Sequence, residues 1–286
     1  MFNTTIATQI YAKICFEATN SQKKIIENLS EYLSDDDFSR IFVLNGFAGT
    51  GKTTLIAALV AALKELRIKP VLLAPTGRAA KVLARYCGEQ ALTIHKRIYR
   101  QRTNADYESK FSLDFNREQG AVFIVDEASM LSDSTGDGAL FGSGSLLEDL
   151  VSYVRSGRGC RLILVGDSAQ LPPVGCDFSP ALDPATVSRY GEVVYGLMDE
   201  VVRQQMQSGI LFNATLVRCM LENRIYEIPK FEMDYPDFES VEGGDFMEKL
   251  QDAFDRYGRD EVIVITQDNK FSYYDRTRHE FAPTRP

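Results

Sequence analysis

The stretch IFVLNGFAGTGKTT, residues 41–54, determines the fold class that this sequence predicts. A short continuous run of apolar residues leads into a glycine-rich turn, and the helical pattern TTLIAALVAALKELR (53–67) follows directly. Continuous rather than alternating apolar residues are typical of a strand that is covered on both faces. The stretch therefore predicts a buried strand, a tight turn and a helix in immediate succession.

Further apolar runs of the same kind recur along the chain. They are VLLAP (71–75), AVFIVD (121–126), RLILVGD (161–167) and EVIVIT (261–266), with helical patterns such as GRAAKVLARYC (77–87) between them. Strands that alternate with helices predict an α/β fold, with a mainly parallel sheet and helices on both of its faces.

The composition is that of an ordinary soluble globular protein, with 44% hydrophobic and 25% charged residues among 286. No apolar run approaches the length of a membrane span, and the start MFNTTIATQI lacks a basic region followed by a long apolar one. We therefore predict a cytoplasmic protein without a membrane partner. The five cysteines form no C-x-x-C pair, so we expect plain thiols rather than a zinc site or a disulfide framework.

The charge distribution bears on nucleic-acid binding more than the net charge of −8 does. Residues 64–110 carry eleven Lys and Arg against four Asp and Glu, whereas residues 190–286 carry eleven against nineteen. A basic segment within an acidic chain can follow a phosphate backbone, because the local potential matters more than the total. An ordinary solvated basic face is the alternative interpretation.

The segment GFAGTGKTT (46–54) fits the pattern G-x-x-x-x-G-K-[ST] in the strand-to-helix context that gives this pattern its meaning. Glycines allow successive N–H groups to face a β-phosphate, and the N-terminus of the helix adds to the attraction. Lys52 is expected to reach the β- and γ-phosphate oxygens, and the Thr53 hydroxyl to join a Mg²⁺ shell. The predicted nucleotide-binding residues of this loop are Gly46, Ala48, Gly49, Thr50, Gly51, Lys52, Thr53 and Thr54.

The segment FIVDEASM supplies two adjacent carboxylates at the end of a predicted strand. Asp126 can hold Mg²⁺ through water, and Glu127 can orient and deprotonate an attacking water molecule. Either acid alone is more often a helix cap, but the pair beside a lysine loop favours catalysis. The sequence therefore predicts a hydrolase of ATP or GTP.

A third strand runs into the polar turn of LILVGDSAQLPPVG, residues 162–175. Asp167 and Gln170 are expected to lie beside the γ-phosphate, where an amide can donate to phosphate oxygen and accept from water. Pro172 and Pro173 fix the backbone that follows, so a small shift at Gln170 would move what lies beyond it. The alternative is a simple exit from the strand with a solvated glutamine.

Taken in order, six segments resemble the motifs of superfamily 1 DNA helicases, nearest to the RecD-like subclass that translocates 5′→3′. They are GFAGTGKTT, APTGRAAKVL, TIHKRIY, IVDEASM, LVGDSAQLPPVG and DEVVRQ, and the resemblance covers about residues 16–225. It implies a RecA-like P-loop lobe, ATP and Mg²⁺ as cofactors, and single-stranded DNA or a single/double-strand junction as the partner. It also implies a role in DNA repair or recombination.

The resemblance also assigns roles to residues that the sequence alone leaves open. Gln22 corresponds to a glutamine that reads the adenine edge, and Arg203 to a catalytic arginine directed at the γ-phosphate. The single-stranded DNA path is implied to include Pro75, Thr76, Gly77, Arg78, Lys81, Thr93 and His95. For His95 an ordinary packed or hydrogen-bonded side chain is the alternative.

The expected organisation has four parts. They are an N-terminal helical segment (1–40), the first RecA-like lobe (41–225), an acidic connector (226–260) and the start of a truncated second lobe (261–286). Within the first lobe, residues 96–118 are expected to form a hairpin like the pin that splits a duplex, with Tyr and Phe side chains able to stack on bases. Residues 132–145 are expected to form a mobile loop. We expect the chain to be part of a longer helicase.

Three functional interpretations remain open from the sequence. The first is a fragment of an ATP-dependent DNA helicase, and the second a nucleotide-switched ATPase that binds single-stranded DNA without unwinding. The third is a P-loop ATPase unrelated to DNA, which requires the basic segment to be ordinary surface.

Overall fold

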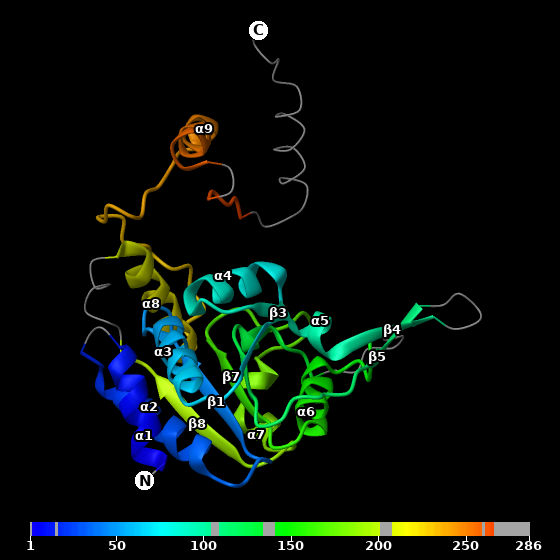
Figure 1. Cartoon of the computed structure of the whole chain (residues 1–286). Helices are drawn as coiled ribbons and strands as arrows, with labels where there is room; N and C mark the ends of the chain where they lie inside the picture. The colour runs from blue at the N-terminus through cyan, green and yellow to red at the C-terminus, as the bar shows by residue number, and fades with distance from the viewer. Residues whose placement is uncertain are drawn as a thin grey trace. The chain divides into compact units, whose positions relative to one another are not determined.

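A computed structural model of the chain describes residues 2–14, 17–103, 109–133, 141–200, 208–258 and 261–265. The chain divides into two compact units, Met1–Phe231 and Glu232–Pro286. The first unit contains a parallel sheet with helices on both sides and a separate two-stranded hairpin (Figure 1). The predicted α/β fold class is confirmed.

The main sheet has six strands in the order β3-β2-β6-β7-β1-β8, and every neighbouring pair is parallel. The strands are β1 (Ile41–Gly46), β2 (Pro70–Ala74), β3 (Ala91–Thr93), β6 (Val122–Val125), β7 (Arg161–Gly166) and β8 (Val193–Met198). The four that the sequence predicts occupy the middle of the sheet. The edge strands β3 and β8 were not predicted, because one is three residues long and the other is exposed at alternate positions.

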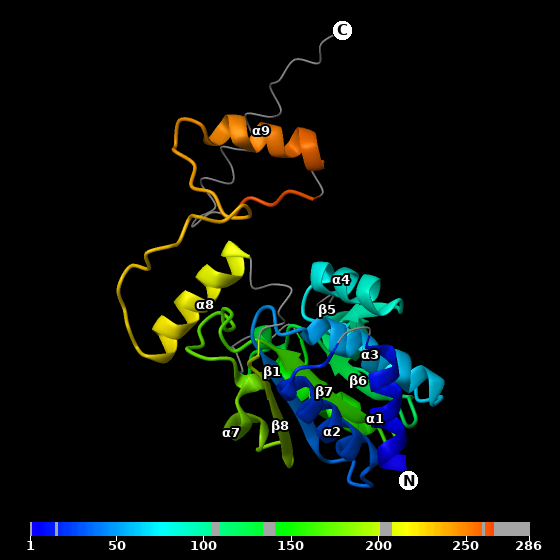
Figure 2. The same ribbon diagram turned by 90° about the vertical axis from the view of Figure 1, so that its left-hand side faces the viewer.

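Helices cover the two faces of this sheet in separate layers (Figures 1 and 2). The first layer consists of α1 (Phe2–Lys13), α2 (Asn20–Ser34), α3 (Lys52–Glu65) and α4 (Gly77–Cys87). The second consists of α5 (Ile94–Ile98), η1 (Ala128–Met130), α6 (Leu146–Ser156), η2 (Pro180–Leu182) and α7 (Pro184–Val187). In β1, Phe42 and Leu44 pack into the first layer whereas Ile41 and Val43 pack into the second. Burial on both faces explains the continuous apolar runs in the sequence.

The hairpin lies within the segment for which the sequence predicts one. Strands β4 (Tyr99–Thr103) and β5 (Ser109–Leu113) pair antiparallel, from Tyr99↔Leu113 to Thr103↔Ser109. It projects away from the main sheet (Figure 1). Part of the loop predicted at 132–145 lies outside the described residues.

The last part of the chain differs from the sequence prediction. The first unit contains α8 (Gly209–Glu222), and the second contains α9 (Phe246–Tyr257), which lies within the predicted connector. The predicted strand at 261–266 is wrong for its described residues 261–265, which form no strand. Ile263 and Ile265 are 59% and 87% exposed, and a strand is not stable without a partner to complete its hydrogen bonds.

The parallel arrangement brings the predicted site residues to one edge of the sheet. The carboxyl ends of parallel strands meet at the same edge, where open α/β sheets bind ligands. The phosphate loop follows β1, Asp126 follows β6, and Asp167 follows β7. Thr76 caps the start of α4 two residues after β2, and Thr93 ends β3.

Candidate active site

The phosphate loop curls between β1 and α3 as its glycines require. Gly49 and Gly51 have φ angles of 76° and 87°, a left-handed conformation that favours glycine. A Cβ on Gly46 would lie 2.9 Å from Cγ of Lys52 and 3.0 Å from Cβ of Met198, so a larger residue would displace the lysine. The loop is closed by Thr50, whose hydroxyl donates to the Phe47 carbonyl at 2.8 Å.

Lys52 lies at the start of α3 and folds back over the loop. Its ammonium donates to the carbonyl oxygens of Gly46 and, at 2.9 Å, of Phe47. It also lies 3.9 Å from Oδ2 of Asp167. Burial lowers the pKa of Lys52, and the carboxylates around it act in the opposite direction. The hydrogen bonds of Lys52 go to backbone carbonyls, and its ion pair with Asp167 is long, so the ammonium can exchange these partners for phosphate oxygens.

Two of those carboxylates are the adjacent acids that follow β6. Glu127 has a φ of 55°, and its N–H donates to Oδ1 of Asp126 at 3.0 Å. Burial raises the pKa of Asp126, and burial followed by repulsion from Asp126 raises the pKa of Glu127. A left-handed φ in a residue other than glycine is uncommon and concentrates at functional sites. Lys52 acts on the charge of both acids, so the three side chains share one electrostatic environment.

The residues at this edge of the sheet fit a Mg²⁺ ion that arrives with a nucleotide. Thr53 and Asp126 offer a hydroxyl and a carboxylate, and oxygen ligands are those that Mg²⁺ prefers. Among the described residues, no three His, Cys, Asp or Glu side chains gather to hold a metal ion by themselves.

The turn after β7 brings Asp167 beside the phosphate loop. Asp167 is only 3% exposed, and its Oδ1 accepts the N–H of Ala169 at 2.9 Å. Its carbonyl accepts the N–H of Gln170 at 3.1 Å, which closes the turn and leaves the Gln170 side chain exposed. Beyond the turn, Leu171 and Val174 are 87% and 103% exposed around the two prolines.

Gln22 reaches the phosphate loop from the first turn of α2. Its Nε2 donates to the carbonyl of Thr50 at 2.9 Å, and its Oε1 accepts the N–H of Thr19 at 3.0 Å. The Thr19 hydroxyl in turn accepts the N–H of Gln22, which completes a capping box. The amide is 1% exposed, so it would have to exchange partners before it could read an adenine edge.

The predicted catalytic Arg203 lies outside the described residues. Glu200, three residues before it, is a residue whose role the sequence did not indicate. Its carboxylate accepts the N–H groups of Asn20 and Ser21, each at 3.1 Å, at the start of α2. A carboxylate at a helix N-terminus is stabilised by the helix dipole. The end of β8 is thereby joined to the helix that carries Gln22.

The predicted DNA-contacting residues cluster at the carboxyl ends of β2 and β3. These strands pair with Ala74 opposite Thr93, so the starts of α4 and α5 lie close together. The hydroxyls of Thr76 and Thr93 accept the N–H groups of Ala79 and Lys96, each at 3.2 Å, as helix N-caps. Pro75 is half-buried, and Gly77, Arg78 and Lys81 are exposed at the start of α4.

His95 is half-buried and packs against other rings, and its place on the DNA path remains a prediction. Its ring lies 5.6 Å from that of Tyr99 and 5.0 Å, edge to face, from that of Phe141. Burial lowers its pKa. The geometry is that of an aromatic cluster.

The same cluster holds two of the four aromatic residues predicted for the hairpin, so these two are not free to stack on bases. Tyr99 is buried and its phenol donates to Asp149 of α6 at 2.6 Å. Phe111 stacks on Phe141 with ring centres 4.5 Å apart. These two rings anchor the base of the hairpin, whereas Phe115 is 65% exposed. Tyr107 lies outside the described residues.

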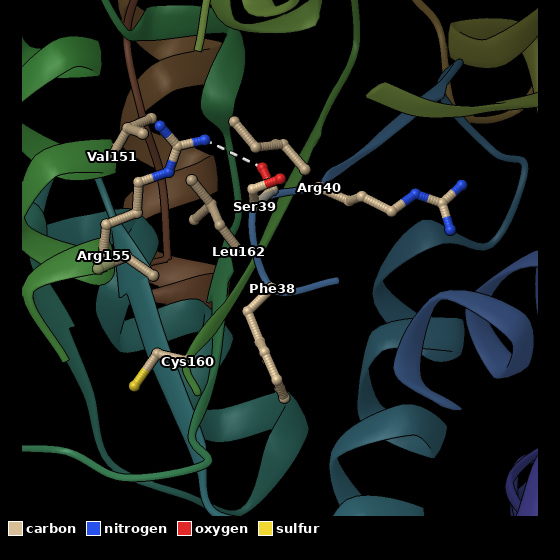
Figure 3. A pocket seen from close by; sticks show the side chains of 9 residues that line it. Phe38, Ser39, Arg40, Val151, Arg155, Cys160 and Leu162 are labelled. Atoms are coloured by element: carbon tan, nitrogen blue, oxygen red, sulfur yellow. Dashed lines mark hydrogen bonds between the residues drawn. The ribbon is translucent and has the colours of Figure 1, made fainter. Parts of the chain in front are cut away.

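A small pocket lies at the opposite end of the strands, near the start of β1 and β7 (Figure 3). Phe38, Cys160 and Leu162 line it, and Arg155 donates to the Ser39 carbonyl at 2.9 Å across it. Because it adjoins the amino ends of the strands, it is separate from the phosphate loop.

The fold and this edge of the sheet define the class of the chain, which is a P-loop nucleoside triphosphatase of RecA-like fold. Residues 18–211 match the sequence profile of the AAA domain family, so the chain belongs to that family. Within its described part, no helix is both long enough and apolar enough to cross a membrane.

Two curated relatives confirm the resemblance to RecD-like helicases. The ATP-dependent RecD2 DNA helicase of Deinococcus radiodurans is 30% identical over 154 residues, which is 54% of this chain and 19% of the relative. The RecBCD enzyme subunit RecD of Mycobacterium tuberculosis is 33% identical over 201 residues, which is 57% of this chain and 32% of the relative. The chain therefore spans a third or less of the length of these relatives.

A solved structure is similar over a larger part of the chain. It is the Pif1 helicase from Bacteroides in complex with ADP-AlF3 and single-stranded DNA, with 17% identity and a TM-score of 0.49. The similarity covers 94% of this chain and 58% of the Pif1 chain.

Proposed function

We propose that this chain is the ATP-hydrolysing part of a DNA helicase that translocates 5′→3′ on single-stranded DNA. The observation that carries the proposal is the position of Lys52, 3.9 Å from Asp167 and in one electrostatic environment with Asp126 and Glu127. The motifs of RecD-like helicases and the curated helicase relatives support DNA as the partner.

In the proposed reaction, ATP binding moves Lys52 from the carbonyls of Gly46 and Phe47 to the β- and γ-phosphate oxygens. Thr53 and Asp126 would hold Mg²⁺, which would supply positive charge beside the phosphates. Glu127 orients the attacking water and takes its proton. A raised pKa makes its carboxylate a stronger base.

Three further residues complete the proposed nucleotide site. Gln22 reads the adenine edge after its amide leaves Thr50 and Thr19. Arg203 stabilises the charge that develops on the γ-phosphate. Asp167 and Gln170 detect that phosphate, because both belong to the turn beside Lys52.

The proposed DNA path crosses the carboxyl ends of β2 and β3. The Thr76 and Thr93 hydroxyls already accept N–H groups as caps, and each retains a proton to donate to a phosphate. Arg78 and Lys81 add positive charge on the exposed start of α4. The hairpin is proposed to act as a pin at a single/double-strand junction, with its base fixed by Tyr99 and Phe111.

The test is ATP turnover by this chain with and without single-stranded DNA. Lys52→Ala should abolish hydrolysis, whereas Lys64→Ala, at an exposed position of the same helix, should leave it unchanged. Gln170→Ala should retain ATP binding but lose the stimulation by DNA. Turnover that survives in Lys52→Ala, or normal stimulation in Gln170→Ala, would remove these assignments.

The second candidate function is a nucleotide-switched DNA-binding ATPase without unwinding. Unwinding of duplexes with 5′ or 3′ single-stranded tails separates the candidates. Unwinding of the 5′-tailed substrate alone supports the helicase and its direction, and DNA-stimulated turnover without unwinding supports the switch.

A further inference from the structure

Asn45 is a buried amide at a position where the strand pattern calls for an apolar residue. It follows Ile41 and Val43 on the side of β1 that faces the second helix layer, and it is 6% exposed. It immediately precedes Gly46, the first glycine of the phosphate loop. A buried amide destabilises the fold unless its hydrogen bonds are made, so its partners indicate what this residue does.

The amide bonds to one residue of a neighbouring strand and to one residue of the turn that follows the other neighbouring strand. Its Oδ1 accepts the N–H of Ser168 at 3.0 Å, and its Nδ2 donates to the Ser168 hydroxyl at 2.8 Å. The same Nδ2 donates to the phenol oxygen of Tyr195 at 3.0 Å. Ser168 follows β7 and Tyr195 lies on β8, the two strands that flank β1 in the sheet.

Each of these strands leads to a different part of the proposed nucleotide site. β1 runs into the phosphate loop, and β7 into the turn in which Ser168 follows Asp167. β8 leads to Glu200, which holds the start of α2, and further along the chain to Arg203. The Asn45 side chain thus bonds both to the turn that follows β7 and to β8.

We propose that Asn45 is a positioning residue that fixes the turn carrying Asp167 and Gln170 against the phosphate loop. This inference rests on the proposed function of that turn as a detector of the γ-phosphate. Two bonds to Ser168 set where the turn begins, and Asp167 then lies 3.9 Å from Lys52. Without the amide, the turn keeps its internal bonds but loses its fixed distance from the loop.

The neighbouring cleft explains why the turn needs such a bond. Asn45, Ser168 and Tyr195 line an open cleft of about 360 Å³ together with Phe178 and Asp183. Phe178 is 57% exposed and Ser168 is exposed, so packing is sparse over this part of the turn. The hydrogen bonds to Asn45 therefore help to fix its position.

The prediction concerns affinity for the γ-phosphate. Asn45→Leu keeps a side chain of similar size but makes none of the three bonds. Its affinity for ATPγS should fall about fivefold to tenfold while its affinity for ADP stays within about twofold, since only the γ-phosphate contacts the turn. Isothermal titration calorimetry of the chain with Mg²⁺ and each nucleotide measures both values.

Two milder variants keep the test valid if Asn45→Leu does not fold. Ser168→Ala removes one bond to the amide and should cause a smaller, selective loss of affinity for ATPγS. Ser168→Thr keeps the hydroxyl and should retain that affinity. Tyr195→Phe removes only the bond to β8 and should leave ATPγS affinity within about twofold. Equal losses for ADP and ATPγS in the Asn45 and Ser168 variants would mean a merely structural role and would overturn the inference.

The same measurements distinguish a failure of the proposed function from a failure of the inference about Asn45. If the unaltered chain binds ADP and ATPγS equally, or neither, the γ-phosphate is not detected at this turn and the proposed function fails. If the unaltered chain prefers ATPγS, Gln170→Ala reduces that preference, and the Asn45 and Ser168 variants keep it, only the inference about Asn45 is wrong.

Discussion

Replacing Gln22 by methionine is expected to lower the stability of the first unit, because the Gln22 amide supports the phosphate loop. This loss of stability does not depend on nucleotide binding. Methionine keeps the size of the side chain and removes only the amide. The amide makes two hydrogen bonds, from Nε2 to the Thr50 carbonyl at 2.9 Å and from the Thr19 N–H to Oε1 at 3.0 Å. Because Gln22 is 1% exposed, water cannot replace these bonds.

The size of the effect follows from the two groups left without partners. A buried carbonyl deprived of its donor costs about 1–3 kcal/mol, and the loss of a helix cap costs about 1 kcal/mol. The sum is about 2–4 kcal/mol. For domains of 150–250 residues each kcal/mol lowers the melting temperature by about 2–4 °C, so the expected shift is about 5–15 °C.

Thermal unfolding followed by circular dichroism measures this shift. Thr19→Ala is the matched variant, since it removes one acceptor of the capping box but leaves the bond to Thr50, and it should cost about 1 kcal/mol. Gln90→Met, at an exposed position, controls for the substitution itself. A shift for Gln22→Met no larger than that for Thr19→Ala would refute the reasoning that the amide supports the phosphate loop.

Gln22→Met also tests the proposal that Gln22 contacts the adenine edge of the nucleotide. If Gln22 contacts the base, Gln22→Met should lose the preference for ATP over GTP as well as stability. Equal losses of affinity for the two nucleotides would leave the amide with its structural role alone.

Three other predictions follow from the site. Glu127→Gln should abolish ATP turnover and raise the melting temperature at pH 8, because burial raises the pKa of Glu127 and its ionised form destabilises the folded state above that pKa. The gain should disappear below about pH 4, where the residue is protonated in both states, and melting curves at both pH values test this. Tyr99→Phe removes the 2.6 Å hydrogen bond to Asp149 and should lower the free energy of unfolding by about 1–3 kcal/mol, measured by denaturant titration. An unchanged midpoint would contradict the anchoring of the hairpin by Tyr99. Arg78→Ala should reduce the salt dependence of binding to oligothymidine by about 0.7 in the log–log slope, whereas Lys64→Ala should not. An equal change of the slope in both variants would mean that the loss of any positive charge has this effect, and would contradict a contact between Arg78 and a DNA phosphate.

The sequence was informative wherever a residue type is forced by the backbone or by chemistry. Glycines at 49 and 51 were predicted as a phosphate loop, and both adopt the left-handed conformation that such a loop requires. The strands in the middle of the sheet were predicted from continuous apolar runs, because a strand buried on both faces leaves no polar face. The roles of Asp126, Glu127 and Asp167 remain predictions, although the fold brings them to one edge of the sheet.

The sequence was less informative where an element depends on its neighbours. The edge strand β8 carries exposed residues such as Tyr195 and Leu197, so its apolar pattern is weak. The apolar run at 261–266 reads as a strand, but its described residues 261–265 form none. For the aromatic residues of the hairpin, the composition could not distinguish free rings from rings that pack on Phe141.

The sequence by itself determined the local chemistry of this protein, which is a lysine loop, two adjacent acids and a polar turn, each placed after a buried strand. The order of the strands was decided only by the tertiary structure, because strand pairing depends on packing between segments far apart in the chain. That order puts β7 and β8 on either side of β1 and makes Asn45 the neighbour of Ser168 and Tyr195. The same long-range packing gives Gln22 its bond to the phosphate loop, which no pattern within its own helix could have indicated.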